Sequence, residues 1–158
     1  HELTHSFPTR RSSDLSFLSV EECRNVIDAI AEAENNCSGE IRVNIANNAG
    51  ENVMESAVNV FYSLEMDKTQ RKNGVLFFIA SEDRRFAVIG DEGINNVVPE
   101  NFWNDVCALM IEYFKKEEYG AGLVAGIKKC GEKLAEFFPP VDNDIDELPN
   151  EIAYEDAK

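Results

Sequence analysis

The chain has 158 residues, of which 44% are hydrophobic and 28% are charged, and its formal net charge at pH 7 is -15. These proportions are ordinary for one folded domain and exclude a chain that is disordered throughout. The negative charge argues against nucleic acid or an anionic membrane as a partner, because both bind basic surfaces. No segment approaches the roughly 18 consecutive apolar residues of a membrane span. We therefore expect a cytoplasmic monomer with no membrane span.

The cysteines are too far apart in the sequence to form a clustered zinc site. A chain of this length can build a core without disulfides. We therefore interpret the cysteines as reduced and mostly buried thiols, in keeping with a cytoplasmic protein. They are Cys23, Cys37, Cys107 and Cys130.

Composition divides the chain into three parts. Residues 1–16 lack periodicity and contain both histidines, and we interpret them as a non-native or disordered leader. Residues 17–138 carry the organised pattern of a domain. Residues 139–158 are acidic and poor in apolar side chains, which is typical of a disordered tail. Residues 142–146 begin like an EF-hand loop, but the glycine and the final glutamate that such a loop needs are missing.

The domain begins with a predicted helix. Ser19 and Glu22 fit a capping box, and apolar side chains then recur at helical spacing to about Asn35. Residues 41–45 alternate with a period of two, which predicts a strand with one solvated face.

A helix and two strands follow. Residues 54–64 predict an amphipathic helix, and residues 75–80 form a continuous apolar run typical of a central strand covered on both faces. A short turn at residues 81–85 leads to a third strand at residues 86–89. We expect this third strand to form a hairpin with the second.

The remainder of the domain is predicted to be helical. Residues 90–99 predict a loop, and Pro99 suits the first turn of a helix that continues to Phe114. The Gly-Ala-Gly sequence at residues 120–122 interrupts the helical pattern. Residues 123–138 predict a last helix, which stops before two prolines.

This order of elements predicts an α/β domain with a small central sheet and helices on both faces. If a right-handed crossover joins the first two strands, they are parallel, and the third strand runs antiparallel to the second. The sheet is therefore expected to be mixed.

Familiar enzyme motifs are absent from the sequence, which has no GxGxxG, P-loop, HExxH or GxSxG motif. Residues 17–138 also contain no histidine, so a Ser-His or Cys-His nucleophile pair cannot form there. We therefore assign no catalytic residues.

Carboxylates gather at one edge of the predicted sheet. Asp91 lies in the loop after the third strand, at the edge where the first two strands begin. Asp67 before the second strand, Glu40 before the first, and Glu100 in the opening turn of the third helix are expected to reach the same edge. Carboxylates, and carbonyls turned inward by glycine-rich loops, are ligands that calcium prefers. These four residues are our candidate metal ligands.

Each of these residues has an ordinary alternative role. Asp67 can shape a turn, and Glu100 can complement a helix dipole. Glu40 can pair with Arg42 or Arg71. Four carboxylates at one edge would repel one another without a cation, and for this reason we favour a cation site.

The opposite edge of the predicted sheet carries charges of both signs, which we interpret as ion pairs and hairpin charges. They are Asp83, Arg84, Arg85 and Glu118. We interpret the large aromatic residues of the last two helices as core, because they lack the basic surroundings that a nucleic-acid platform needs. They are Phe102, Trp103, Phe114, Phe137 and Phe138.

Five short segments, in order, resemble the TPM domain family. They are residues 38–43, 73–76, 83–84, 90–93 and 119–123. The resemblance extends from about Phe17 to Phe138 and is closest to bacterial stand-alone cytoplasmic members of the family. It implies a Rossmann-like three-layer α/β/α sandwich with a small mixed central sheet. It also implies a calcium-type double site that ties together two crossing loops, here residues 66–73 and 90–99.

The resemblance and the acidic edge together suggest a divalent-metal-binding regulatory or interaction module. Calcium, or magnesium in its place, would bind at Asp91, Glu100, Asp67 and Glu40, and the loaded protein would recruit an unidentified protein partner. Plant lumenal relatives imply the alternative of a weak metal-dependent acid phosphatase, a phosphoric monoester hydrolase linked to photosystem repair. An animal relative implies a receptor modulator. A purely structural cation is a third interpretation.

Overall fold

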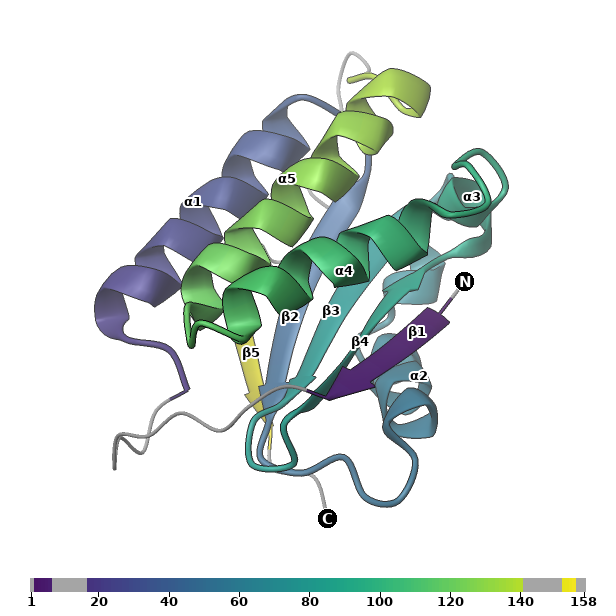
Figure 1. The fold of residues 1–158 in the computed structure, drawn as a ribbon. Helices are drawn as coiled ribbons and strands as arrows, with labels where there is room; N and C mark the ends of the chain where they lie inside the picture. The colour runs from purple at the N-terminus through teal and green to yellow at the C-terminus, as the bar shows by residue number, and fades with distance from the viewer. Residues whose placement is uncertain (1, 7–16, 141–151, 156–158) are drawn as a thin grey trace.

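A five-stranded sheet with helices on both faces forms the domain (Figure 1). The computed structural model describes residues 2–6, 17–140 and 152–155, with side chains for residues 17–140. The strand order is β1-β4-β3-β2-β5. The strands are β1 (Glu2–Ser6), β2 (Glu40–Ala46), β3 (Gly74–Ala80), β4 (Arg85–Gly90) and β5 (Ile152–Glu155).

The central strands have the predicted directions. β2 and β3 are parallel and are joined through the helix α2 (Val53–Ser63), whereas β3 and β4 form an antiparallel hairpin. All seven residues of β3 are buried, which confirms the continuous apolar run as a central strand. All seven residues of β2 are also buried, so the prediction of one solvated face on that strand is wrong.

Two edge strands come from parts of the chain that the sequence pattern leaves outside the sheet. β1 pairs antiparallel with β4, and β5 pairs parallel with β2. Backbone pairing explains them, because an open strand edge offers unpaired N–H and C=O groups whatever the side chains are. The division of the chain at residues 16/17 and 138/139 stays a prediction, and the EF-hand-like run at residues 142–146 lies outside the described residues.

The helices form two layers around the sheet. One face is covered by α1 (Val20–Asn35), α4 (Phe102–Phe114) and α5 (Tyr119–Phe137), and the other by α2 (Figure 1). The larger core lies beneath the three helices and the smaller one beneath α2. The α/β/α sandwich is thereby confirmed.

The start of α1 is fixed by its predicted capping box. The Ser19 hydroxyl accepts the Glu22 N–H at 3.1 Å, and a Glu22 carboxylate oxygen accepts the Ser19 N–H at 2.8 Å. Two backbone donors that would otherwise lack partners are thus satisfied at the first turn.

The predicted break at residues 120–122 is wrong, because α5 begins at Tyr119 and continues through these residues. The glycines are needed for close packing rather than for a turn. A side chain on Gly120 would lie 2.7 Å from Cβ of Glu22, and one on Gly131 would lie 2.9 Å from Cβ of Ala33. Glycine therefore lets α5 approach α1 closely, at the cost of some helix propensity.

The loop after β4 also differs from the prediction. It contains a short helix, α3 (Glu92–Asn95), and α4 begins only at Phe102. The indole N–H of Trp103 donates to the Asn95 side chain at 2.8 Å, which ties the start of α4 to α3. Glu100 therefore lies in the turn before α4 and not in its first turn.

The thiols agree with the prediction. None of the cysteines in the described chain forms a disulfide, and Cys37, Cys107 and Cys130 are buried. Burial raises the pKa of Cys107 to about 12, so this thiol is protonated and inert at neutral pH. The core assignment of the aromatic residues holds for Phe102, Trp103 and Phe114, whereas Phe137 is 40% exposed at the end of α5.

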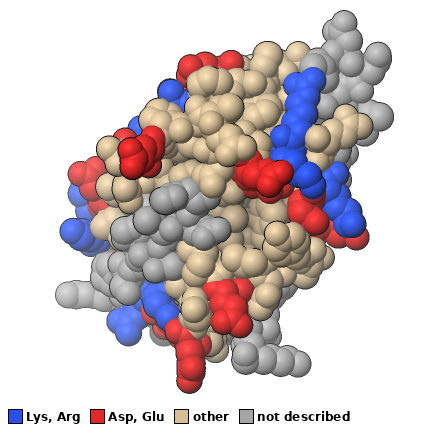
Figure 2. Space-filling model, turned by 90° about the vertical axis from the view of Figure 1, so that its right-hand side faces the viewer, with Lys and Arg blue, Asp and Glu red and all other residues tan. Residues whose placement is uncertain are grey.

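The surface on the side of β1 and α3 is mixed in charge. Among the side chains that Figure 2 colours, acidic and basic groups are scattered between uncharged ones. Within the described residues, no helix combines the length and hydropathy needed to cross a membrane.

Candidate cation site at the sheet edge

The ends of three central strands meet at one edge of the sheet. Glu40, the first residue of β2, is the register partner of Gly74, the first residue of β3. On the other side of Gly74, its carbonyl accepts the Asp91 N–H at 2.9 Å, just beyond the end of β4. Glu40, Gly74 and Asp91 therefore form one row across the sheet, which we call the edge row.

The edge row lies on the face that α2 covers. Leu76 and Phe78 of β3 pack in the α2-side core, and side chains alternate along a strand, so Gly74 belongs to the same face. Asp91 lines a cavity of about 240 Å³ together with Phe61 and Tyr62 of α2. The predicted convergence of β2, β3 and β4 thus brings two of the candidate carboxylates to one face.

A backbone carbonyl covers the middle of the edge row. A side chain on Gly74 would lie 3.2 Å from the carbonyl oxygen of Met66, so the missing side chain makes room for this oxygen. Met66 begins the 3-10 turn η1 (Met66–Lys68), which contains Asp67. The row therefore combines carboxylates with a carbonyl oxygen, the mixture of ligands that hard cations take.

Asp91 has a carboxylate oxygen in an unusual environment. Its Oδ1 accepts the Glu92 N–H at 2.8 Å and caps α3. Its Oδ2 is buried and has no hydrogen-bond partner among the described residues. Burying a carboxylate oxygen without a partner costs free energy, and a cation at this position would remove that cost.

The two loops that border the edge row cross in close contact. A side chain on Gly93 would lie 2.5 Å from the carbonyl oxygen of Lys72 and would also overlap the carbonyl oxygen of Arg71. The Ile94 N–H donates to the same Lys72 carbonyl at 3.3 Å. The loop before β3 and the loop after β4 are therefore in direct backbone contact.

The structure gathers the predicted ligands only in part. Glu40 and Asp91 share the edge row, and Asp67 lies in the adjoining turn, where its carbonyl accepts the Lys72 ammonium group. Glu100 is exposed before α4. Among residues 17–140, no three His, Cys, Asp or Glu side chains are already placed to hold a metal ion.

Two features of the site cannot be predicted from the chemistry of the side chains alone. Met66 contributes through its carbonyl, and Gly74 through the absence of a side chain. The only sequence signal was a glycine at the start of an apolar strand, where a side chain would normally pack.

At the opposite edge of the sheet, Asp83 and Arg85 form an ion pair of the kind predicted there. Asp83 Oδ2 accepts the Ala49 N–H at 2.7 Å and pairs with Arg85 Nη2 at 3.1 Å. The pKa of Asp83 is lowered, first by the hydrogen bond from Ala49 and then by Arg85. This carboxylate therefore stabilises the turn between β3 and β4.

Comparison with known proteins identifies the family. The family model described as the TPM domain matches residues 13–133. The chain is similar to the BA42 protein from the psychrophilic bacterium Bizionia argentinensis, known from an NMR structure, with 44% sequence identity, a TM-score of 0.84, and coverage of 90% of this chain and 99% of that one. It also resembles the N-terminal domain of the cg2496 protein from Corynebacterium glutamicum, with 12% identity, a TM-score of 0.59, and coverage of 80% and 87%, which shows the fold alone. No curated protein matches the sequence at a significant level. With a family match over most of its length and a 44% identical relative, the chain belongs to the TPM domain family.

Proposed function

We propose that the protein is a divalent-cation-binding interaction module that takes calcium at the edge row. The observation that carries the proposal is the buried Oδ2 atom of Asp91, which has no hydrogen-bond partner among the described residues. A neighbouring carboxylate, Glu40, and the Met66 carbonyl extend the set of oxygen atoms at the same edge.

The residues present fit a hard cation. Asp91 and Glu40 would supply carboxylate oxygens, Met66 a carbonyl oxygen, and Asp67 a further carboxylate from the adjoining turn. Calcium accepts six to eight oxygen ligands in irregular arrangements, whereas magnesium demands near-octahedral geometry and retains water. An open edge between two loops therefore favours calcium. Glu100, exposed in the turn before α4, is the remaining candidate ligand.

Cation binding would act on the two crossing loops. One loop leads into η1 and the other into α3, and they already touch at Gly93. A cation that bridges them would favour the conformation in which both are ordered, and a partner that prefers this conformation would bind the loaded protein more tightly. This is the regulatory step that we propose.

The test is a calcium titration of chelator-treated protein, followed by calorimetry and amide NMR, with magnesium as the comparison. We expect saturable calcium binding, with shifts concentrated at residues 66–74 and 90–96. Asp91→Asn should weaken binding at least about tenfold, since it replaces a charged ligand by a neutral one. Asparagine caps helices about as well as aspartate, so the fold should be kept.

The matched control is Asp105→Asn, which removes one exposed carboxylate from α4. It should leave calcium affinity unchanged. Equal affinities in wild type and Asp91→Asn would refute the site. Metal-dependent hydrolysis of a phosphomonoester that disappears in Asp91→Asn would favour the acid phosphatase instead.

A further inference from the structure

A long groove runs along the outer surface between α1 and α5, on the layer that faces the viewer in Figure 1. The two helices pack closely where α5 has glycine, at Gly120 against Glu22 and at Gly131 against Ala33. With short side chains between these points, the surface is hollow instead of filled. The groove is separate from the edge row, and the inference drawn from it does not rest on the proposed cation site.

The groove is large enough for a segment of protein. Its first part has a volume of about 750 Å³, and a second part of about 600 Å³ continues it, with Ala29, Glu32 and Lys128 lining both. α1 has 16 residues, so the groove follows roughly 24 Å of helix at 1.5 Å per residue. That length accommodates four to five turns of a third helix.

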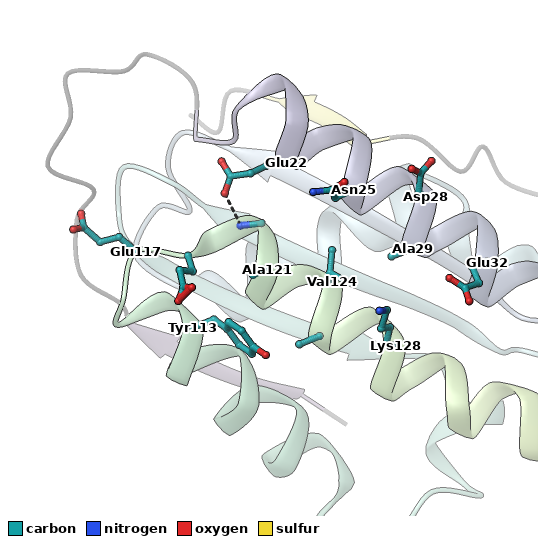
Figure 3. Close-up of a pocket in the computed structure, with 13 residues that line it drawn as sticks. Glu22, Asn25, Asp28, Ala29, Glu32, Tyr113, Glu117, Ala121, Val124 and Lys128 are labelled. Carbon is teal, nitrogen blue, oxygen red and sulfur yellow. Dashed lines mark hydrogen bonds between the residues drawn. The ribbon is translucent and has the colours of Figure 1, made fainter.

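The floor and the rim of the groove differ in chemistry. The floor is made of small or apolar residues from both helices, including Ala29, Ala121, Val124 and Ala125. The rim is acidic, and Figure 3 shows its side chains along α1 and at the turn before α5. The acidic rim residues are Glu22, Asp28, Glu32, Glu117, Glu118 and, in the second part, Glu132.

Not all of these carboxylates have the same role. Glu22 is committed to the fold, since its carboxylate accepts the Ser19 N–H at 2.8 Å and the Gly120 N–H at 2.9 Å. Asp28, Glu32 and Glu118 are exposed. Lys128 is the one basic residue that lines the described groove, and it points from α5 toward α1 (Figure 3). The rim therefore attracts positive charge around an apolar floor.

Charge decides among the possible occupants. A second copy of this chain carries a net charge of -15 and would be repelled, and the same holds for the acidic residues 139–158. Nucleic acid is repelled for the same reason. A single cation would leave the apolar floor uncovered. The complementary occupant is a basic amphipathic helix of another protein, with a narrow apolar stripe against the floor and Lys or Arg side chains over the rim.

We propose that the groove between α1 and α5 is a docking site for a basic amphipathic helix. The small floor residues let the helix approach closely, and the exposed rim carboxylates pair with its basic flanks. This assigns a surface and a partner chemistry that the edge row does not provide.

The test uses a fluorescein-labelled 18-residue peptide, with an alanine and leucine stripe flanked by lysines, titrated with the full chain in the presence of chelator. We expect saturable anisotropy changes and amide shifts along α1 and α5. A scrambled peptide of the same composition, which cannot form the stripe, should bind at least about fivefold more weakly. A peptide with glutamate in place of lysine should not bind.

Two variants test the two halves of the groove. Asp28→Asn with Glu32→Gln removes two rim charges and should weaken binding roughly fivefold, at about 0.5 kcal/mol for each exposed pair. Ala121→Leu fills an exposed floor position and should also weaken binding. The matched control is Asp105→Asn with Glu112→Gln, which removes two exposed charges from α4 outside the groove and should leave affinity unchanged.

Three results would overturn the proposal. They are equal binding of the ordered and scrambled peptides, equal weakening by the rim and control variants, and no binding even at low salt. Either of the first two results would mean that the overall charge of the protein alone attracts the peptide. Because chelator is present throughout, failure here leaves the cation proposal untouched, and failure of the cation proposal leaves this one untouched.

Discussion

Asp83 illustrates how one carboxylate stabilises the fold away from the candidate site. It joins the β3–β4 turn to the loop after β2 by accepting the Ala49 N–H, and it also accepts a hydrogen bond from the Arg85 guanidinium at the start of β4. Its side chain is 25% exposed, so these interactions are partly shielded from solvent. Hydrogen bonds to charged groups are stronger than neutral ones, and the ionised form of Asp83 is therefore the stabilising form.

We predict that Asp83→Asn lowers the free energy of unfolding by roughly 1.5 kcal/mol at neutral pH. The pKa of Asp83 in the folded protein lies below its ordinary value of 3.8. The stabilisation is thus fully present above pH 3.8 and is lost as the pH falls through the folded-state pKa. Urea unfolding followed by circular dichroism should show the difference between the two proteins shrinking below pH 3.8. A difference that stays constant with pH would contradict the prediction.

At the scale of elements, the crossing of the two loops is the contact on which the candidate site depends. Gly93, in α3, lies against the backbone of Arg71 and Lys72, and backbone atoms cannot rotate away as a side chain can. We predict that Gly93→Ala lowers the free energy of unfolding by about 2 kcal/mol through overpacking. It should also increase amide exchange at residues 66–73 and 90–96.

Asn96→Ala is the control for this substitution, because Asn96 is exposed at the end of the same short helix. Its effect should stay within about 0.5 kcal/mol. If Gly93→Ala is as stable as the control, the loops have room to separate, and coupling between them through this contact is excluded.

The elements show how far the sequence alone could predict this fold. Periodicity and apolar runs predicted the strands from β2 to β4 and the helices α1, α2 and α4, because burial imposes a pattern on the side chains that survives in the sequence. The strand directions followed from connection rules. It failed at α5, where glycine was taken as a helix breaker. In fact Gly120 and Gly131 allow close contact with α1, which is distant in the sequence, and such contacts leave no local sequence pattern.

The site was predictable to a similar degree. The sequence could place Asp91 and Glu40 at the same edge of the sheet because the strand directions follow from connection rules. The Met66 carbonyl could not be predicted as a ligand from the sequence, since every residue has a carbonyl. Only the folded loop determines which carbonyl lies over Gly74. The sequence placed Glu100 in the first turn of the third helix. In the structure, α3 and the Trp103–Asn95 contact precede that helix, and α4 begins only at Phe102.

At the scale of the whole molecule, the net charge of -15 opposes the compact state through self-repulsion. Salt screens this repulsion, since the Debye length falls from about 30 Å at 0.01 M to about 10 Å at 0.1 M. We therefore predict that sodium chloride raises the melting temperature over this range by a few degrees, equivalent to about 1 kcal/mol. Differential scanning calorimetry at fixed pH measures the shift, and a falling melting temperature would contradict the prediction.

The same experiment separates general screening from binding at the edge row. Calcium at about 100 times its dissociation constant should add about 2.7 kcal/mol of stability when it binds only the folded state. In wild type this gain should exceed that of sodium chloride at matched ionic strength. In Asp91→Asn, where binding is at least about tenfold weaker, the calcium gain should fall to about 1.4 kcal/mol or less at the same calcium concentration, while the response to sodium chloride stays unchanged. If both proteins gain equally from calcium, the cation acts on the overall charge, and the carboxylate of Asp91 is not a ligand.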